Sequence, residues 1–96
     1  MQVVFSQAAK QDLLDIWVYI ASQSSQTIAD RIYDHISQTC SLLSEYPELG
    51  RERPEIADLA RSIVVERWLI LYQLSDNRVQ IVRILDGSRD IKNIWG

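Results

Sequence analysis

Hydrophobic residues in the first half of the chain recur at the spacing of one face of an α-helix. Two such stripes are separated by the polar segment 22–25. Ser6 and Ser25 directly precede the stripes, where a serine hydroxyl can accept a hydrogen bond from a free amide of the first helical turn. Pro47 ends the second stripe, so we expect two helices that form an antiparallel hairpin. The stripes consist of Ala9, Leu13, Ile16, Trp17 and Ile20, and of Ala29, Ile32, Tyr33, Ile36, Cys40 and Leu43.

Strand-like runs make up most of the second half of the chain. They cover residues 60–65, 68–74 and 79–85, and they follow a loop bounded by Pro47 and Pro54. The connections between these runs are so short that consecutive strands are expected to pair as antiparallel hairpins.

The order of these elements predicts the fold class. A short β-favouring run, 1–5, precedes the first helix, which gives the order β-α-α-β-β-β. This order is typical of an α+β fold, here a two-helix antiparallel hairpin packed on an antiparallel sheet of about four strands. We expect one domain over 1–96, because so short a chain buries a single core. Its parts are the helical hairpin 6–46, the sheet meander 60–86 and a C-terminal tail 87–96.

Alternation along the strands assigns their side chains to two faces of the sheet. If the connections are two-residue turns, at 66–67 and 76–77, Arg61 faces Tyr72 across one pair of strands. Ile70 then faces Arg83 across the next pair. One face carries Arg61, Ile63, Val65, Trp68, Ile70, Tyr72, Leu74, Val79, Ile81, Arg83 and Leu85. The other face carries Val64, Leu69, Leu71, Val82 and Ile84, with Ser62, Gln73 and Gln80.

Both faces are apolar enough to require a cover. We expect the aliphatic second face to pack on the helical hairpin. The first face, with Arg61, Tyr72 and Arg83, then has the composition of a partner site that the tail covers only in part. In the alternative arrangement the first face packs on the helices, and the arginines extend from its rim to solvent.

Charge and composition narrow the function classes. The net charge is −3, and the pI is near 5.0, whereas proteins that bind free nucleic acid usually carry a positive excess. Basic residues concentrate in residues 51–96, where seven of the eight are arginine. The apolar run 68–72 is far too short to cross a bilayer, and no export leader precedes residue 6. We therefore expect a cytoplasmic protein without a membrane partner.

Catalytic and metal-binding chemistry has little support in the residues. His35 is the one histidine and lies on the polar flank of the second helix, and Cys40 is the one cysteine and lies within the apolar stripe. Neither has the companions that a metal site or a nucleophilic centre needs. Asp12 and Asp15 are expected to be solvated. The sequence predicts no cofactor, no metal ion and no catalytic residues.

The order and content of the local motifs resemble the ParE/RelE superfamily of toxins over nearly the full chain. The matching segments are DLLDIWVYI at 12–20, PELGRER at 47–53, Arg61 at the start of a strand, WLILY at 68–72 and VRILDGSRD at 82–90. The resemblance implies a compact sheet with the helical hairpin on one face. It also implies a cognate antitoxin protein that forms a hetero-oligomer with the toxin and neutralises it, and through which alone the toxin would meet operator DNA.

The superfamily divides by mechanism. RelE-like members cut messenger RNA in the ribosomal A site with basic side chains and a late tyrosine or histidine, whereas ParE-like members are associated with poisoning DNA gyrase. Arg61 and Arg83 stand where RelE-like toxins keep catalytic arginines. The RelE-like lysines have no counterpart, and no tyrosine follows Tyr72. The first helix and the ending at 86–90 resemble the ParE-like branch, although Asp86 stands where ParE-like chains commonly have histidine.

These features favour a ParE-like toxin that binds gyrase and is not an enzyme. The alternatives are a ribosome-dependent endonuclease and an inactive relative that only binds antitoxin. The residues expected to contact the target or the antitoxin are Arg61, Trp68, Tyr72, Arg83, Asp86, Arg89 and Trp95.

Overall fold

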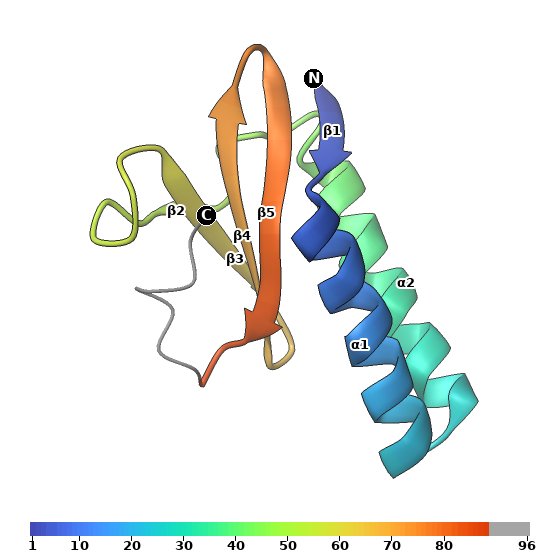
Figure 1. The fold of residues 1–96 in the computed structure, drawn as a ribbon. Coiled ribbons are helices and arrows are strands. Elements are labelled where there is room, and N and C mark those ends of the chain that lie inside the picture. The colour runs from blue at the N-terminus through green and yellow to red at the C-terminus, as the bar shows by residue number, and fades with distance from the viewer. Residues whose placement is uncertain (89–96) are drawn as a thin grey trace.

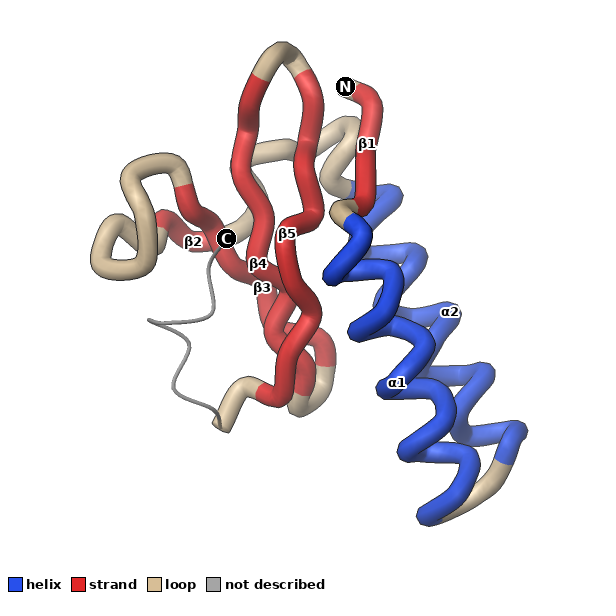
Figure 2. Tube along the Cα trace, viewed as in Figure 1, coloured by secondary structure: helices blue, strands red, loops and turns tan. Residues whose placement is uncertain are grey.

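Two layers make up the structure, a helical hairpin and a sheet that it covers on one side (Figures 1 and 2). A computed structural model describes residues 1–88. The elements are β1 (Gln2–Phe5), α1 (Gln7–Gln23), α2 (Gln26–Leu42), β2 (Arg51–Glu52), β3 (Ala60–Val65), β4 (Trp68–Ser75) and β5 (Arg78–Asp86). The predicted α+β class and helical hairpin are confirmed. Within residues 1–88, no helix is long and apolar enough to span a membrane.

Over residues 1–88, the sheet has five strands in the order β1-β5-β4-β3-β2. Its central pairs, β3–β4 and β4–β5, are antiparallel hairpins, as predicted. The short strand β2 adds a fifth strand that the sequence pattern did not indicate, at one edge beside β3. At the other edge, β1 runs parallel to β5, with Val3 beside Val79 and Phe5 beside Ile81. The first strand of the chain is therefore paired with the last.

Serine caps begin both helices, as the sequence predicts. The Ser6 hydroxyl accepts a hydrogen bond from the amide of Ala9 at 2.9 Å, and the Ser25 hydroxyl accepts one from Ile28 at 3.1 Å. Ser6 also donates its hydroxyl proton to the carbonyl oxygen of Val82 at 2.7 Å. One side chain thus starts α1 and joins it to β5.

Turn chemistry sets the register of the hairpins. Asp76 and Asn77 adopt φ angles of 52° and 60°, the left-handed conformation that tight two-residue hairpins favour. The predicted pairing of Arg61 with Tyr72 is confirmed. The predicted pairing of Ile70 with Arg83 is wrong, because the register between β4 and β5 shifts by one residue beside Leu71 and Tyr72.

The extra residue at this shift is Val82, which has no pairing partner in β4, whereas its neighbours Ile81 and Arg83 do. Such a bulge reverses the alternation of the strand. Ile81 and Ile84 consequently both contribute to the core beneath the helices, although a regular strand would put them on opposite faces.

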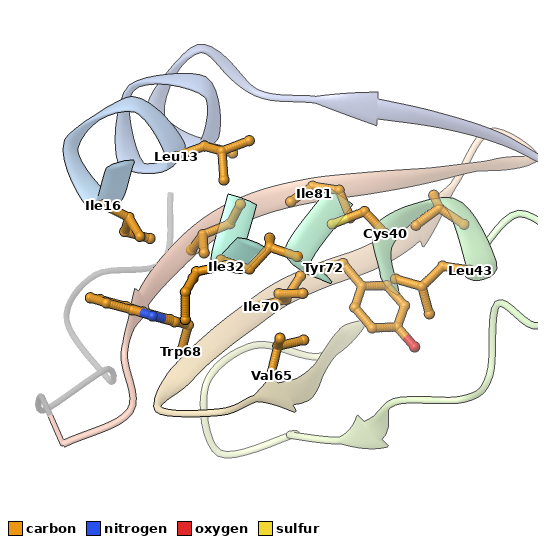
Figure 3. Close-up of a cluster of buried hydrophobic side chains, with 14 residues drawn as sticks. Leu13, Ile16, Ile32, Cys40, Leu43, Val65, Trp68, Ile70, Tyr72 and Ile81 are labelled. Carbon is orange, nitrogen blue, oxygen red and sulfur yellow. The ribbon is translucent and has the colours of Figure 1, made fainter. Parts of the chain in front are cut away.

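The face that packs on the helices is the one carrying Val65, Trp68, Ile70 and Tyr72, so the expected assignment of the faces is wrong. The alternative is right in packing this face on the helices. Its arginines do not both extend to solvent, because Arg83 is bound to Asp12. Figure 3 shows the side chains of this face directed at the helical residues Leu13, Ile16, Ile32, Cys40 and Leu43. The large rings of Trp68 and Tyr72 fill the space between the layers, where they are 6% and 0% exposed. The opposite face has a smaller cluster of Leu69, Leu71 and Leu85, against which Ile56 packs.

Candidate partner-binding surface

Tyr72 lies in the core and uses its hydroxyl to hold the loop that follows α2. The hydroxyl donates to the carbonyl oxygen of Pro47 at 2.8 Å and accepts a hydrogen bond from the amide of Gly50 at 2.8 Å. Burial raises the pKa of Tyr72 above its ordinary value. Gly50 packs so closely that a Cβ there would lie 2.6 Å from the Tyr72 ring. Tyr72 is therefore buried, and its side chain offers no surface that a partner could contact.

Arg61 also binds the loop that follows α2. Its Nη1 donates to the carbonyl oxygens of Gly50 at 2.8 Å and Glu48 at 3.3 Å. Nη2 lies 3.6 Å from the carboxylate of Glu52. The sequence correctly predicted that Arg61 and Tyr72 are neighbours, because they pair directly across β3 and β4. Their shared role is to fix the loop.

Arg83 is separated from that pair and bound to α1. Its Nε and Nη2 donate to the two carboxylate oxygens of Asp12 at 2.8 and 2.9 Å, a bidentate ion pair. The backbone amide of Ile84 also donates to Asp12, at 3.0 Å. The hydrogen bond from Arg83 to Asp12 raises the pKa of Arg83 above its ordinary value. The expectation that Arg83 shares a face with Arg61 and Tyr72 is wrong, because the bulge at Val82 reverses β5 just before it.

Asp12 joins α1 to β5, a structural role that the sequence reasoning missed. It was expected to be solvated, yet its side chain is only 12% exposed. The carboxylate bonds the edge of β5 just beyond the part that β1 covers. One signal could have identified it, since Asp12 lies next to Leu13 in the apolar stripe and therefore at the border of the buried face.

A shallow depression of about 330 Å³ lies where α1 meets the end of β5. Arg67, in the turn between β3 and β4, is one of the residues that line it. The guanidinium carbon of Arg67 lies 4.8 Å from the centre of the Trp68 ring and 5.8 Å from that of Tyr19. The Arg67 guanidinium also forms an ion pair with the carboxylate of Asp86. Trp68 and Asp86, both predicted as contact residues, thus meet at one place.

Asp86 is bound within the chain and is not a free carboxylate. Its Oδ1 accepts hydrogen bonds from the amide of Ser88 at 3.0 Å and from the Ser88 hydroxyl at 2.9 Å, and its Oδ2 pairs with Arg67. These bonds, that from the Ser88 amide first, lower the pKa of Asp86 from 3.8 to about 2. Arg89 and Trp95, the remaining predicted contact residues, lie outside the described residues 1–88.

The low pKa of Asp86 predicts a pH dependence of stability. A carboxyl whose pKa is lower in the folded chain than in the unfolded chain stabilises the fold above the unfolded value, and this contribution disappears as the pH falls. We expect the melting temperature of Asp86→Asn to fall less than that of the wild type when the pH is lowered from about 4 to about 2. Thermal unfolding monitored by circular dichroism across this range is the test. Parallel curves for the two proteins would contradict the assignment.

The helical hairpin has a second apolar surface beside its buried face. Leu14, Val18 and Tyr33 are 54%, 52% and 42% exposed. Leu14 and Tyr33, together with Trp17, border a groove of about 390 Å³ between α1 and α2. Its full lining is Phe5, Lys10, Leu13, Leu14, Trp17, Tyr33, Ser37 and Ser41. The sequence reasoning placed Tyr33 in the core and overlooked Leu14 and Val18, which repeat at a spacing of four residues beside the buried stripe.

Within residues 1–88, no group of three or more histidine, cysteine, aspartate or glutamate side chains could hold a metal ion. Cys40 is buried, and desolvation raises the pKa of its thiol to about 12. A thiol with this pKa is almost entirely protonated near neutral pH. The candidate binding sites are therefore two surface features. One is the groove on the helices, and the other is the depression at the end of β5, where Arg67 packs on Trp68 and Tyr19.

Comparison with known proteins supplies the family. The family model described as "ParE toxin of type II toxin-antitoxin system, parDE" matches residues 3–91. The chain is 38% identical to Toxin RelE2 of Caulobacter vibrioides over 88 residues, which are 92% of this chain and 97% of that protein. It is 28% identical to Toxin ParE3 of the same organism over 90 residues, which are 94% of this chain and 90% of that protein.

A solved structure has the same fold. It is titled as a chromosomal ParDE toxin–antitoxin system from P. aeruginosa, and it matches with a TM-score of 0.80 at 19% sequence identity. The match covers 90% of this chain and 95% of the other chain. The family model, which spans nearly the whole chain, shows that the protein belongs to the ParE toxin family of type II toxin–antitoxin systems.

Proposed function

We propose that this ParE-family toxin arrests growth in the cytoplasm by binding DNA gyrase, and that a cognate antitoxin neutralises it. In this proposal the toxin is a binding inhibitor and not an enzyme. Its target surface lies at the end of β5 beside Asp86 and includes Arg89 and Trp95 in the tail. Trp68, which is 6% exposed, supports this surface from the core.

The internal bonds of Arg83 carry the preference for binding over RNA cleavage. An arginine that stabilises a reacting phosphate must offer its donors to that phosphate. In this chain two donors of Arg83 are bound to Asp12, and Arg61 donates to two backbone carbonyls. The hydroxyl of Tyr72 is bound on both sides. Arginine also stays protonated and is a poor general base.

The apolar groove on the helical hairpin supports the proposed antitoxin partner. Its borders are exposed aliphatic and aromatic side chains, and such a groove suits a helix whose apolar residues recur every three or four positions. An antitoxin segment of this kind would bury Leu14, Trp17 and Tyr33. Operator DNA would then be reached only through the antitoxin.

Assays on purified toxin and on induced cells test the proposal. We expect purified toxin to inhibit DNA supercoiling by gyrase, and induced cells to show a DNA-damage response. Messenger RNA mapped by primer extension should be intact within translated codons. Cleavage within codons, together with unimpaired gyrase, would establish the opposite mechanism. Adding antitoxin should restore supercoiling and raise the melting temperature of the toxin, because a ligand of the native state stabilises it.

A second candidate function is ribosome-dependent messenger RNA cleavage. It is favoured by the 38% identity to a protein named Toxin RelE2. In that case Arg61 and Arg83 would contact RNA after leaving their present partners. Mapping messenger RNA by primer extension distinguishes RNA cleavage from gyrase inhibition directly.

A further inference from the structure

A side-chain hydrogen bond crosses the helical hairpin from α1 to α2, which lie side by side (Figure 1). Nε1 of Trp17 donates to Oδ1 of Asp30 at 2.8 Å. Asp30 is exposed, whereas Trp17 is half-buried. The bond fixes one edge of the indole ring, because Nε1–H is the only donor that the ring has. The Trp17 ring therefore has a defined orientation relative to α2.

Trp17 lines the groove between the helices, and Asp30 is not one of the lining residues. The carboxylate thus binds the ring from outside the groove and leaves the groove wall apolar. Leu14 and Tyr33 are exposed apolar side chains of the same groove, and an indole ring that rotated freely could pack on them. Such packing would remove apolar surface from water and fill the groove. The hydrogen bond to Asp30 opposes this movement.

Charge on the helices indicates the kind of partner that the groove fits. Residues 7–42 carry four aspartates against Lys10 and Arg31. Arg31 is paired with Glu66, and Asp12 is paired with Arg83, which leaves three carboxylates against one ammonium group. An apolar groove with this surplus of carboxylates around it suits a segment with the opposite charge beside its own apolar face. The occupant is therefore an amphipathic helix with basic side chains next to its apolar ones.

We propose that Asp30 is a positioning residue, whose bond to Trp17 keeps the groove open for an antitoxin helix of this kind. Asp30 increases the affinity of the toxin for its antitoxin by holding the ring that the antitoxin contacts. The inference deepens the proposed function and rests on the antitoxin binding in this groove.

Removal of the bond should lower affinity while the stability of the fold is retained. A single hydrogen bond changes an equilibrium by a factor of about three to ten. Affinity for the antitoxin falls as far as the fraction of molecules with an open groove falls. The melting temperature of Asp30→Ala should hardly change, because the bond is exposed and alanine has the higher helix propensity.

The test compares Asp30→Ala with Asp30→Asn and Asp34→Ala. Asp34 lies one turn further along α2 and is exposed, and Trp17 is bonded to Asp30 instead, so Asp34→Ala measures the loss of a carboxylate alone. Asp30→Asn retains a side-chain oxygen that can accept the indole proton. Three quantities are measured: the melting temperature, the exchange of the Trp17 indole proton with water by NMR, and the dissociation constant of purified cognate antitoxin by calorimetry.

We expect Asp30→Ala to speed exchange of the indole proton and to weaken antitoxin binding about three- to tenfold. Asp30→Asn should retain most of both properties, and Asp34→Ala should weaken binding by less than about twofold. Unchanged indole exchange in Asp30→Ala would overturn the proposal, because the ring would then be held by other contacts. Equal losses of affinity in Asp30→Ala and Asp34→Ala would also overturn it, because the loss of charge alone would explain both.

Trp17→Phe distinguishes positioning from direct contact. A phenylalanine ring has no N–H group, so in that background Asp30 has no donor to bind. Asp30→Ala should then lower antitoxin affinity no further than Asp34→Ala does. A full three- to tenfold loss in the Trp17→Phe background would show that Asp30 contacts the antitoxin itself, and the positioning role would be wrong.

Failure of the proposed antitoxin site gives a different result. Tyr33→Ala removes a ring from the groove and leaves the bond between Trp17 and Asp30 in place. If antitoxin binds Tyr33→Ala as tightly as the wild type, the groove is not its site, and the proposal fails together with that site. If Tyr33→Ala binds poorly but Asp30→Ala binds normally, the site stands and the role of Asp30 alone is refuted.

Discussion

Replacing Asp12 with asparagine should lower the free energy of unfolding by about 2–3 kcal/mol. The change removes the charge that holds Arg83 and weakens the bond to the amide of Ile84. Breaking a fully buried ion pair costs about 3–5 kcal/mol. The expected cost is smaller because Arg83 and Asp12 are 25% and 12% exposed. Urea unfolding monitored by circular dichroism measures the change.

Asp15→Asn is the matched control for this experiment. Asp15 lies three residues further along α1, is exposed, and bonds only Gln11 of its own helix among the described contacts. Its replacement should change stability by less than about 0.5 kcal/mol. Equal losses in the two variants would show that the Asp12–Arg83 pair has no special role. Arg83→Met completes a double-mutant cycle with Asp12→Asn, and a coupling near zero would lead to the same conclusion.

Gly50→Ala should destabilise the fold by about 2–4 kcal/mol. The new methyl group would lie 2.6 Å from both Cε1 and the hydroxyl oxygen of Tyr72, and 2.9 Å from the backbone oxygen of Ser62. Tyr72 is fully buried and cannot swing away, so the loop must shift and its hydrogen bond to the tyrosine hydroxyl is lost. Thermal unfolding of the purified variant gives the magnitude.

Leu49→Ala tests whether the effect belongs to this contact or to the loop in general. Leu49 precedes Gly50 and is 50% exposed, so its truncation should be nearly neutral. Tyr72→Phe should lie between the two, at about 1–3 kcal/mol, because it leaves the Gly50 amide without its buried acceptor. A wild-type melting curve for Gly50→Ala would disprove the close packing.

Sequence reasoning succeeded where structure is decided locally. The serine caps and the turn at Asp76 and Asn77 depend on residues within four positions of each other, and all were predicted. The neighbourhood of Arg61 and Tyr72 followed from the turn alone. The bulge at Val82 could not be predicted, because the hydrophobic run through β5 fits both phases of the alternation. That one residue moved Ile84 to the core and Arg83 to Asp12.

The candidate surfaces were predicted only in part. Trp68 and Asp86 were named from the sequence, but Arg67, which joins them, was not, because a turn arginine has no pattern that distinguishes it from a solvated one. The groove on the helices was missed for a different reason. The apolar stripe identifies the most apolar side of a helix. A second, less apolar side, such as the one that carries Leu14 and Val18, is easily overlooked beside it.

The parallel pairing of β1 with β5 determines when the protein can finish folding. Phe5 meets Ile81, so this sheet edge cannot form until residues 78–81 have left the ribosome. At roughly 5–20 residues per second, the N-terminal strand waits several seconds for its partner. Contacts this distant in sequence also slow refolding, because a long loop must close before they form. A newly made chain therefore has a period after synthesis in which its helical hairpin exists without a completed sheet edge.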